Sequence, residues 1–535
     1  MSATAARAIV VLAKYDIAPD ESDARAVRCV LALRAGLPWL SGHTVVEMRD
    51  VDNLPILELL AGGSKEQATH SIQAIVPHDV IGRLMIQCAR QRHLAEVYDH
   101  LCGFDGCEFY FQNWPDLTAR RWGEVLYSFA DACPIGVRHG AADGSAILLN
   151  PPDDYRMRAG DELLVVAEDD DTYSPDLSGA AKAPKVGAAP AFEARKATND
   201  NVLLCGWRRD LLDMLMELDK YVQPGCVVTI LASVPLSQRT ALLETGKATR
   251  LELQNIQLTH EYGSTILRRD LEKVRSLPLL PLSLSPFLPV PCLPWPFYLP
   301  SCRRRRTADP PHCCRLFPAA AARARAPQVM SARAFGSVLV LASESNEGDE
   351  AASDSRALAT LLLVRDIRSK IVAREKAAIA AAAGGGGSSS SSGGDDDDDG
   401  EEGKEAAAAD FTLLGEILDS ETKDLVAAAG VSDYIMSNRL ISKVIAMVAE
   451  DVAVGPLFEL LFSEEGDELY VRDCRYYAAP GEKLAFWEMQ ARARAQGDVA
   501  IGYKRKHGGV ALNPANKGEK LLWEVGSSLI IIGDH

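Results

Sequence analysis

One pattern occurs twice in this chain and decides the fold. "IVVLAKYDIAPDESDARAVRCVLAL" stands at residues 9–33, and "VLVLASESNEGDEAASDSRALATLLLV" stands at 338–364. Each stretch reads as an apolar strand, an acidic loop, the sequence Ser-Asp-x-Arg-Ala and then the apolar face of a helix. The strands are too apolar to have one face in water, which is typical of a parallel sheet covered by helices on both sides.

The repeat continues beyond these stretches, in the same order in both copies. A strand that ends in a glutamate comes next, as "TVVEMRD" at 44–50 and "LLGEILD" at 413–419. A helix follows, as "IVPHDVIGRLMIQCAR" at 75–90 and "IMSNRLISKVIAMVAE" at 435–450. Such ordered self-similarity predicts two homologous units in tandem.

Each unit ends in a region of short strands. "GCEFYF" at 106–111 matches "GDELYV" at 466–471, and residues 134–170 match residues 500–535. Asp-Gly, Pro-Pro and Ala-Gly pairs separate the apolar runs, which indicates tight turns. We therefore predict an α/β protein of two tandem units, each a Rossmann-like parallel sheet followed by a small β-rich lobe.

The two copies differ at their beginnings. The second opens with a strand, a helix and a strand at 201–233, whereas the first has no such opening. A partial parallel sheet would leave an unpaired edge. We expect the first unit to be truncated at its N-terminus, with the missing strands supplied by preceding chain or by a partner.

Composition divides the chain further. We expect the parallel-sheet lobe of the first unit at 1–100 and its β-rich lobe at 101–172. A linker is expected at 173–198. The parallel-sheet lobe of the second unit is expected at 199–455 and its β-rich lobe at 456–535. Two disordered inserts are expected within the second parallel-sheet lobe, at about 274–328 and at 373–410. The second of these is rich in alanine, glycine, serine and acidic residues, as in flexible linkers.

The stretch "SLPLLPLSLSPFLPVPCLPWPFYLPSCRRRR" at 276–306 has the length of a membrane span. Its recurring prolines each cost about 3 kcal/mol in a helix interior and free carbonyls that a bilayer cannot satisfy. We expect a polyproline-like or disordered segment, no transmembrane helix and a soluble chain. The net charge of −17 argues against a nucleic-acid partner.

Acidic residues gather where strands end. Asp20 and Asp23 follow the first strand, and Glu47 and Asp50 end the next. Because neighbouring parallel strands bring their carboxyl ends to one edge, these oxygens could bind a hard cation such as Ca²⁺. The second copy repeats the arrangement, with the residues Glu416 and Asp419. The alternative is that these are solvated loop acids, some of them paired with arginines.

A Rossmann-like sheet also invites a search for a dinucleotide. The loop after the first strand of the second unit carries a single glycine, Gly206, followed by Trp207 and Arg208. These side chains would keep a pyrophosphate from the backbone, which argues against a dinucleotide, although Arg208 could hold an anion. No nucleophile motif or Walker loop occurs, so we do not expect an enzyme.

Several motifs resemble one family in particular. "SDARA", "HTVVEMRDVDN", "HDVIGRLMIQCARQ", "GDELLVVAEDDDTY", "VLLCGWRRD" and "ELLFSEEGDELYVR" are similar to the Castor and Pollux ion channels of plants and green algae. The resemblance covers most of 7–270 and 329–535. It implies a pore module, absent from this chain, followed by two tandem regulator-of-conductance (RCK) domains.

The resemblance also implies a function. Four subunits would assemble their RCK domains into a ring that gates a cation pore in the nuclear envelope. In calcium-gated RCK proteins, metal-binding acids lie near the positions of Asp20 and Glu47. The alternative is a soluble TrkA-like subunit that binds a nucleotide and regulates a separate cation transporter.

Overall fold

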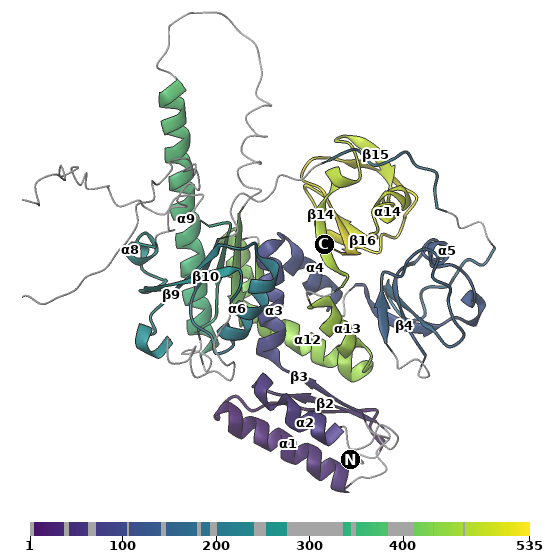
Figure 1. Cartoon of the computed structure of the whole chain (residues 1–535), viewed down its shortest axis with the longest axis horizontal. Helices are drawn as coiled ribbons and strands as arrows, with labels where there is room; N and C mark the ends of the chain where they lie inside the picture. The colour runs from purple at the N-terminus through teal and green to yellow at the C-terminus, as the bar shows by residue number, and fades with distance from the viewer. Residues whose placement is uncertain are drawn as a thin grey trace, which may run out of the picture.

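The structure is a computed structural model. It describes residues 5–36, 42–61, 71–103, 106–140, 146–178, 183–192, 201–239, 253–274, 335–343, 349–383, 411–431, 433–463 and 466–534. The chain forms two sheet-based units at one side of the molecule and two β-rich lobes at the other (Figure 1).

The second unit is built on a parallel sheet of six strands in the spatial order β10-β9-β8-β11-β12-β13. In chain order this is 3-2-1-4-5-6, the arrangement of the doubly wound nucleotide-binding fold. It confirms the predicted Rossmann-like sheet. The strands are β8 (Val202–Cys205), β9 (Cys226–Ala232), β10 (Ile256–Tyr262), β11 (Ser337–Val340), β12 (Thr412–Ile417) and β13 (Asp433–Met436).

The first unit repeats only the second half of that sheet. Its parallel strands lie in the order β1-β2-β3 and correspond to β11-β12-β13. Within the described residues no strand pairs with the outer edge of β1, where Val10 is 40% exposed and Leu12 is 66% exposed. The elements are β1 (Ala8–Val11), α1 (Pro19–Gly36), β2 (His43–Glu47), α2 (Leu54–Ala61), β3 (Ile72–Ile75), α3 (Pro77–Arg90) and α4 (Leu94–Leu101).

The β-rich lobes are antiparallel sheets with the same plan, β4-β7-β5-β6 and β14-β19-β16-β17. Both carry a bulge at the same place, between Pro134 and Gly136 and between Ala500 and Gly502. A Cβ at either glycine would meet a carbonyl oxygen of the paired strand within 3 Å. The strands are β4 (Glu108–Asn113), β5 (Ala132–Arg138), β6 (Ile147–Leu149), β7 (Glu162–Ala167), β14 (Glu468–Asp473), β16 (Val499–Lys504), β17 (Val510–Leu512) and β19 (Ser528–Gly533).

Shorter elements complete the lobes and the second sheet. A two-stranded sheet joins β15 to β18 in the second lobe. The remaining elements are α5 (Trp122–Val125), α6 (Leu211–Tyr221), α8 (Arg268–Leu271), α9 (Glu350–Ala383), α11 (Lys423–Ala428), α12 (Ser437–Glu450), α13 (Val454–Leu461), β15 (Glu482–Ala485), α14 (Phe486–Arg494) and β18 (Lys520–Trp523).

The two units exchange helices. Helix α3 of the first unit packs on β11 and β12 of the second, and α12 of the second packs on β1 and β2 of the first. Helix α3 also packs along α6, beside which it lies in Figure 1. Gly82 allows this close approach, because a Cβ there would lie 3.0 Å from the side chains of Asp210 and Met214. One hydrophobic core therefore runs through both units.

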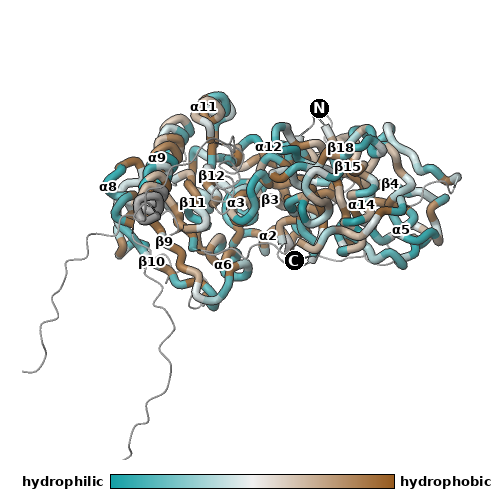
Figure 2. The backbone as a smooth tube through the Cα atoms, turned by 90° about the horizontal axis from the view of Figure 1, so that it is seen from above, coloured by the Kyte–Doolittle hydropathy of each residue, from teal (hydrophilic) through white to brown (hydrophobic). Residues whose placement is uncertain are grey.

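Helix α9 corrects one expected boundary. It continues to Ala383, whereas a flexible linker was expected from residue 373. The sequence "AREKAAIAAAA" at 373–383 consists mainly of strong helix formers, so the helix of the repeat extends into it. In Figures 1 and 2, α9 and the β-rich lobes lie at opposite ends of the molecule.

The other sequence expectations here fall mostly outside the described residues. The proline-rich stretch and the rest of both expected inserts lie in 275–334 and 384–410, which the structure does not describe. Within the described residues, no helix combines the length and the apolar composition that a membrane span needs.

Candidate ligand-binding cleft

The exchanged helices enclose a cavity between the carboxyl ends of the two sheets. It has a volume of about 570 Å³, within the range of ligand sites. We call it the inter-unit cleft. The first unit contributes residues after β1 and β2 and the start of α3, and the second contributes residues after β11 and β12 and the start of α12. Ligands of parallel sheets bind at such edges.

Two equivalent glutamates, one from each unit, line this cleft. Glu47 ends β2 and Glu416 lies near the end of β12, and both are buried. Oε2 of Glu47 accepts from the Ala13 amide at 2.9 Å, and Oε2 of Glu416 accepts from the Ala342 amide at 2.8 Å. Each glutamate thus ties two neighbouring strands together at their ends. Its second oxygen, Oε1, remains for side-chain partners.

The partners of the second oxygens differ between the units. Oε1 of Glu47 accepts from the Tyr15 hydroxyl at 2.7 Å. Oε1 of Glu416 accepts from the Ser437 hydroxyl at 2.9 Å and from the Arg208 guanidinium at 2.8 Å. The Glu416 carboxylate is therefore neutralised by an arginine, whereas the bonds to Glu47 come from uncharged donors. The first-unit side of the cleft is the more favourable place for a cation.

Asp23 is a structural residue in this arrangement. Its two oxygens accept from the amides of Arg49 at 2.8 Å and Asp50 at 3.1 Å. The equivalent residue of the second unit, Asp354, accepts from the amides of Leu418 at 2.8 Å and Asp419 at 2.9 Å. In both units this aspartate holds the chain as it leaves the second strand of the repeat.

Asp50 and Asp419 share another role. Each caps a short 3₁₀ helix, accepting from the amide two residues on at 2.9 Å. Asp20 lies exposed in the first turn of α1. Of the six acids predicted to bind metal, only Glu47 and Glu416 line the inter-unit cleft. Sequence reasoning missed the cleft residues Tyr15 and Ser437, which no charge pattern marks.

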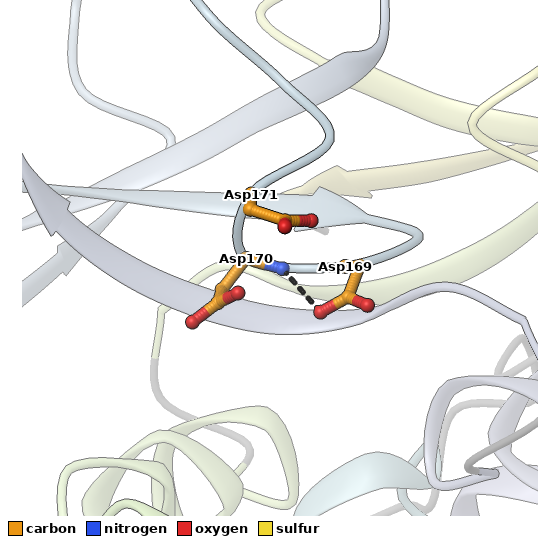
Figure 3. A group of neighbouring side chains, drawn as sticks. All are labelled: Asp169, Asp170 and Asp171. Atoms are coloured by element: carbon orange, nitrogen blue, oxygen red, sulfur yellow. Dashed lines mark hydrogen bonds between the residues drawn. The ribbon is translucent and has the colours of Figure 1, made fainter.

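The predicted acids do not gather into one ligand set. Within the described residues, the single group of three acids close enough to share a cation is Asp169, Asp170 and Asp171 (Figure 3). These residues are exposed on the turn after β7, and the Asp170 amide bonds to Asp169 at 2.8 Å. The run "EDDD" that contains them was visible in the sequence. It reads as a solvated acidic turn.

Arg208 crosses from the second unit to the first. Its side chain is 3% exposed and pairs with Asp210 at 2.6 Å as well as with Glu416. It also donates to the carbonyl of His78, at the start of α3, at 3.1 Å. Burial opposes its charge, but the Asp210 and Glu416 carboxylates raise the pKa of Arg208 above its ordinary value. Instead of an open anion site, Arg208 forms a buried link between the units.

Gly206 lies at a different cavity. Its φ is 125°, and a Cβ there would meet the Leu341 carbonyl oxygen at 2.9 Å. It lines a cavity of about 570 Å³ at the carboxyl ends of β8, β9 and β11, together with the buried Trp207 and the exposed Arg356. This is the crevice where doubly wound sheets bind nucleotides. Arg208 stands where the second glycine of the dinucleotide motif would be needed, and the bulky Trp207 precedes it.

The contact between α3 and α6 concentrates negative charge. Burial raises the pKa of Asp213 to about 6, with further contributions from the carboxylates of Asp210, Asp79, Asp52 and Asp50. Burial also raises the pKa of Asp79, despite its ion pair with Arg83 at 3.1 Å. Acids from both units thus oppose one another where the units meet.

Comparison with known proteins supports the resemblance seen in the sequence. Residues 78–182 match a family described as "Castor and Pollux, part of voltage-gated ion channel". The chain is 37% identical to "Ion channel POLLUX" of Lotus japonicus over 99% of this chain and 50% of that protein. It is 36% identical to "Probable ion channel CASTOR" of Oryza sativa subsp. japonica over 99% of this chain and 51% of that protein.

This chain is similar to the Castor and Pollux ion channels along almost its whole length. It spans about half the length of the curated relatives that it matches. Among solved structures, "Crystal Structure of the GsuK RCK domain" aligns with a TM-score of 0.33 and 13% identity over 99% of this chain and 79% of that one. "GsuK channel bound to NAD" aligns with a TM-score of 0.33 and 12% identity, over 99% and 65%. Such a score is too low to establish a shared fold, so the fold of this chain rests on its own strand order.

Replacing Asp23 with alanine should destabilise the protein. The change leaves two backbone amides at the end of β2 without their acceptor, which should lower the free energy of unfolding by about 2 kcal/mol or more. Urea denaturation measures the effect. Asp16→Ala is the control, because Asp16 forms only an exposed pair with Lys14 and should change stability by less than about 1 kcal/mol. Equal effects of the two changes would contradict the structural role of Asp23.

Replacing Asp213 with asparagine should stabilise the protein in a pH-dependent way. The pKa of Asp213 rises from 3.8 to about 6 on folding, so its ionised form opposes folding above pH 6. As the pH falls from 6 towards 4, the folded wild type takes up a proton and loses this disadvantage. The melting temperature of Asp213→Asn should therefore exceed that of wild type at pH 7.5 and converge with it below pH 4. A constant difference across this range would contradict the shift.

Proposed function

We propose that this chain is the gating region of a Castor/Pollux-like cation channel. The observation that carries the proposal is identity of 36–37% to these channels along 99% of the chain, together with two repeated units that share one cleft. As a gating region it would face the cytosol or the nucleoplasm and regulate ion transport through movement of its two RCK domains. We divide these domains at the boundaries expected from the sequence, with the linker at 173–198.

The inter-unit cleft is the proposed sensor. Its walls belong to different units, so a ligand that contacts both walls stabilises one relative position of the units over others. Helices α3 and α12 each belong to one unit and pack on the other. A ligand that stabilises one relative position of the units therefore moves these helices with them. Linkers to a pore would transmit the movement.

We propose Ca²⁺ as the sensed ligand, in preference to a dinucleotide. Glu47 and Glu350 line the cleft with carboxylates that carry no arginine partner within the described residues, and oxygen is the ligand atom that Ca²⁺ prefers. Glu416 would take part only after release from Arg208. The buried Trp207 disfavours a dinucleotide at the Gly206 loop.

The assembly belongs to the same proposal. We propose that four copies associate through their RCK domains into a ring attached to a membrane pore module, at the nuclear envelope. The net charge of −17 leaves nucleic acid an unfavourable partner.

A chimaera tests the function. Residues 7–535 replace the matching region of the Lotus japonicus POLLUX channel, and single channels are recorded in planar bilayers while Ca²⁺ is varied on the side of the graft. We expect Glu47→Gln to shift the Ca²⁺ dependence of the open probability at least threefold and to leave the unitary conductance unchanged, because a gating region does not line the pore.

The matched control is Glu162→Gln, which removes an equally charged residue from β7, far along the chain from the cleft. It should leave both quantities unchanged. An altered unitary conductance in Glu47→Gln would refute the proposed sensor. So would an open probability that changes neither with the Ca²⁺ concentration nor with this substitution.

A further inference from the structure

A second cavity between the units carries more basic than acidic side chains in its wall. It has a volume of about 710 Å³ and lies between α4 of the first unit and α11, β13 and α12 of the second. It is separate from the inter-unit cleft, because no residue lines both cavities. The charged residues of its wall are Glu96, Asp99, Lys423, Arg439 and Lys443.

The charges in this wall do not balance. Lys443 pairs with Asp99 at 2.7 Å, and Glu96 pairs with Lys504 at 2.7 Å. Within the described residues, the side chains of Lys423 and Arg439 form no ion pair and no hydrogen bond. Two positive charges at the cavity therefore have no directly bonded partner in the part of the chain that the structure describes.

The cations of this wall act on the Asp99 carboxylate. Although burial opposes ionisation, Lys443, Arg439 and Lys423 hold the pKa of Asp99 below its ordinary value. Asp99 is therefore ionised at neutral pH, and its charge is matched by Lys443. The nearby Asp424 acts on Tyr434 but does not line the cavity.

Apart from the exposed His100, the rest of the wall is mostly apolar or aromatic. Leu84 of α3 lines it together with Ile435, Met436 and Leu440 at the junction of β13 and α12, and Tyr434 adds a half-buried ring. A ligand that fits both halves of the wall carries a doubly negative group and a planar or apolar body. A phosphate monoester has about −1.5 to −2 charges at pH 7, which matches the two unpaired cations.

We propose that this cavity binds a phosphorylated organic molecule of about nucleotide size. Arg439 and Lys423 hold its phosphate, and the organic part lies against Tyr434 and the apolar residues. Since α4 belongs to one unit and α11 and α12 belong to the other, an occupied cavity bridges the two units at a point outside the inter-unit cleft. Binding here would add a second input to the same movement.

The experiment uses the whole chain and three probes: ADP, adenosine and inorganic phosphate. Isothermal titration calorimetry should show ADP binding at least tenfold more tightly than either adenosine or phosphate, because only ADP engages both halves of the wall. The variant Lys423→Gln/Arg439→Gln should weaken ADP binding at least tenfold. Its melting temperature should stay close to that of wild type, since among the described residues neither side chain forms an ion pair or a hydrogen bond, and Lys443 remains as the partner of Asp99.

Two further variants locate the site. Asp99→Asn removes the opposing carboxylate, so it should strengthen ADP binding or leave it unchanged. Arg356→Gln removes one cation from the cavity at Gly206 and should have no effect. Weakening by Arg356→Gln in place of the double variant would assign ADP to the Gly206 cavity and overturn the proposal. Absence of ADP binding below millimolar concentration in wild type would also overturn it.

Discussion

The exchange of helices α3 and α12 between the two units is the constraint on which the rest of the structure depends. Each helix follows the last strand of its own sheet and then covers the sheet of the other unit. One apolar face of each sheet is therefore buried only when both units are folded, and one hydrophobic core runs through both units. The opposite faces are covered within each unit, by α1 and α2 in the first and by α9 in the second. The same exchange brings the carboxyl ends of the sheets together and encloses the inter-unit cleft.

The acidic residues at the strand ends serve this architecture first. Asp23 and Asp354 each accept two backbone amides, and Glu47 and Glu416 each fasten two strands. Amides at a buried strand end need acceptors, and a carboxylate satisfies two at once. Only a glutamate's remaining oxygen is then available to a ligand. Most of the acids at the strand ends therefore have structural roles, and fewer oxygens remain for the proposed ligand.

Sequence reasoning reached the fold because its signals are local. The repeated apolar strands, the Ser-Asp-x-Arg-Ala helix start and the turn pairs of the lobes each specify one element, and their order specifies the units. It placed Glu47 and Glu416 at strand ends correctly. It did not separate them from Asp23, Asp50 and Asp419, because a carboxylate that caps a backbone amide and one that faces a cavity look alike along the chain. It ended the long helix too early, at 373, because composition alone does not show where an alanine-rich helix stops.

The sequence by itself determined that two parallel-sheet units with β-rich lobes lie in tandem, that the first has only half a sheet, and that the chain resembles the Castor and Pollux channels. These features follow from periodicity, order and motif, which any reader of the chain can see. Only the tertiary structure decided which unit each helix covers, that Arg208 is committed to Glu416 and Asp210, and that Lys423 and Arg439 face a shared cavity. Apart from the local pair of Arg208 with Asp210, those contacts join segments that lie far apart in the chain, and local pattern carries no information about which distant side chain will meet which.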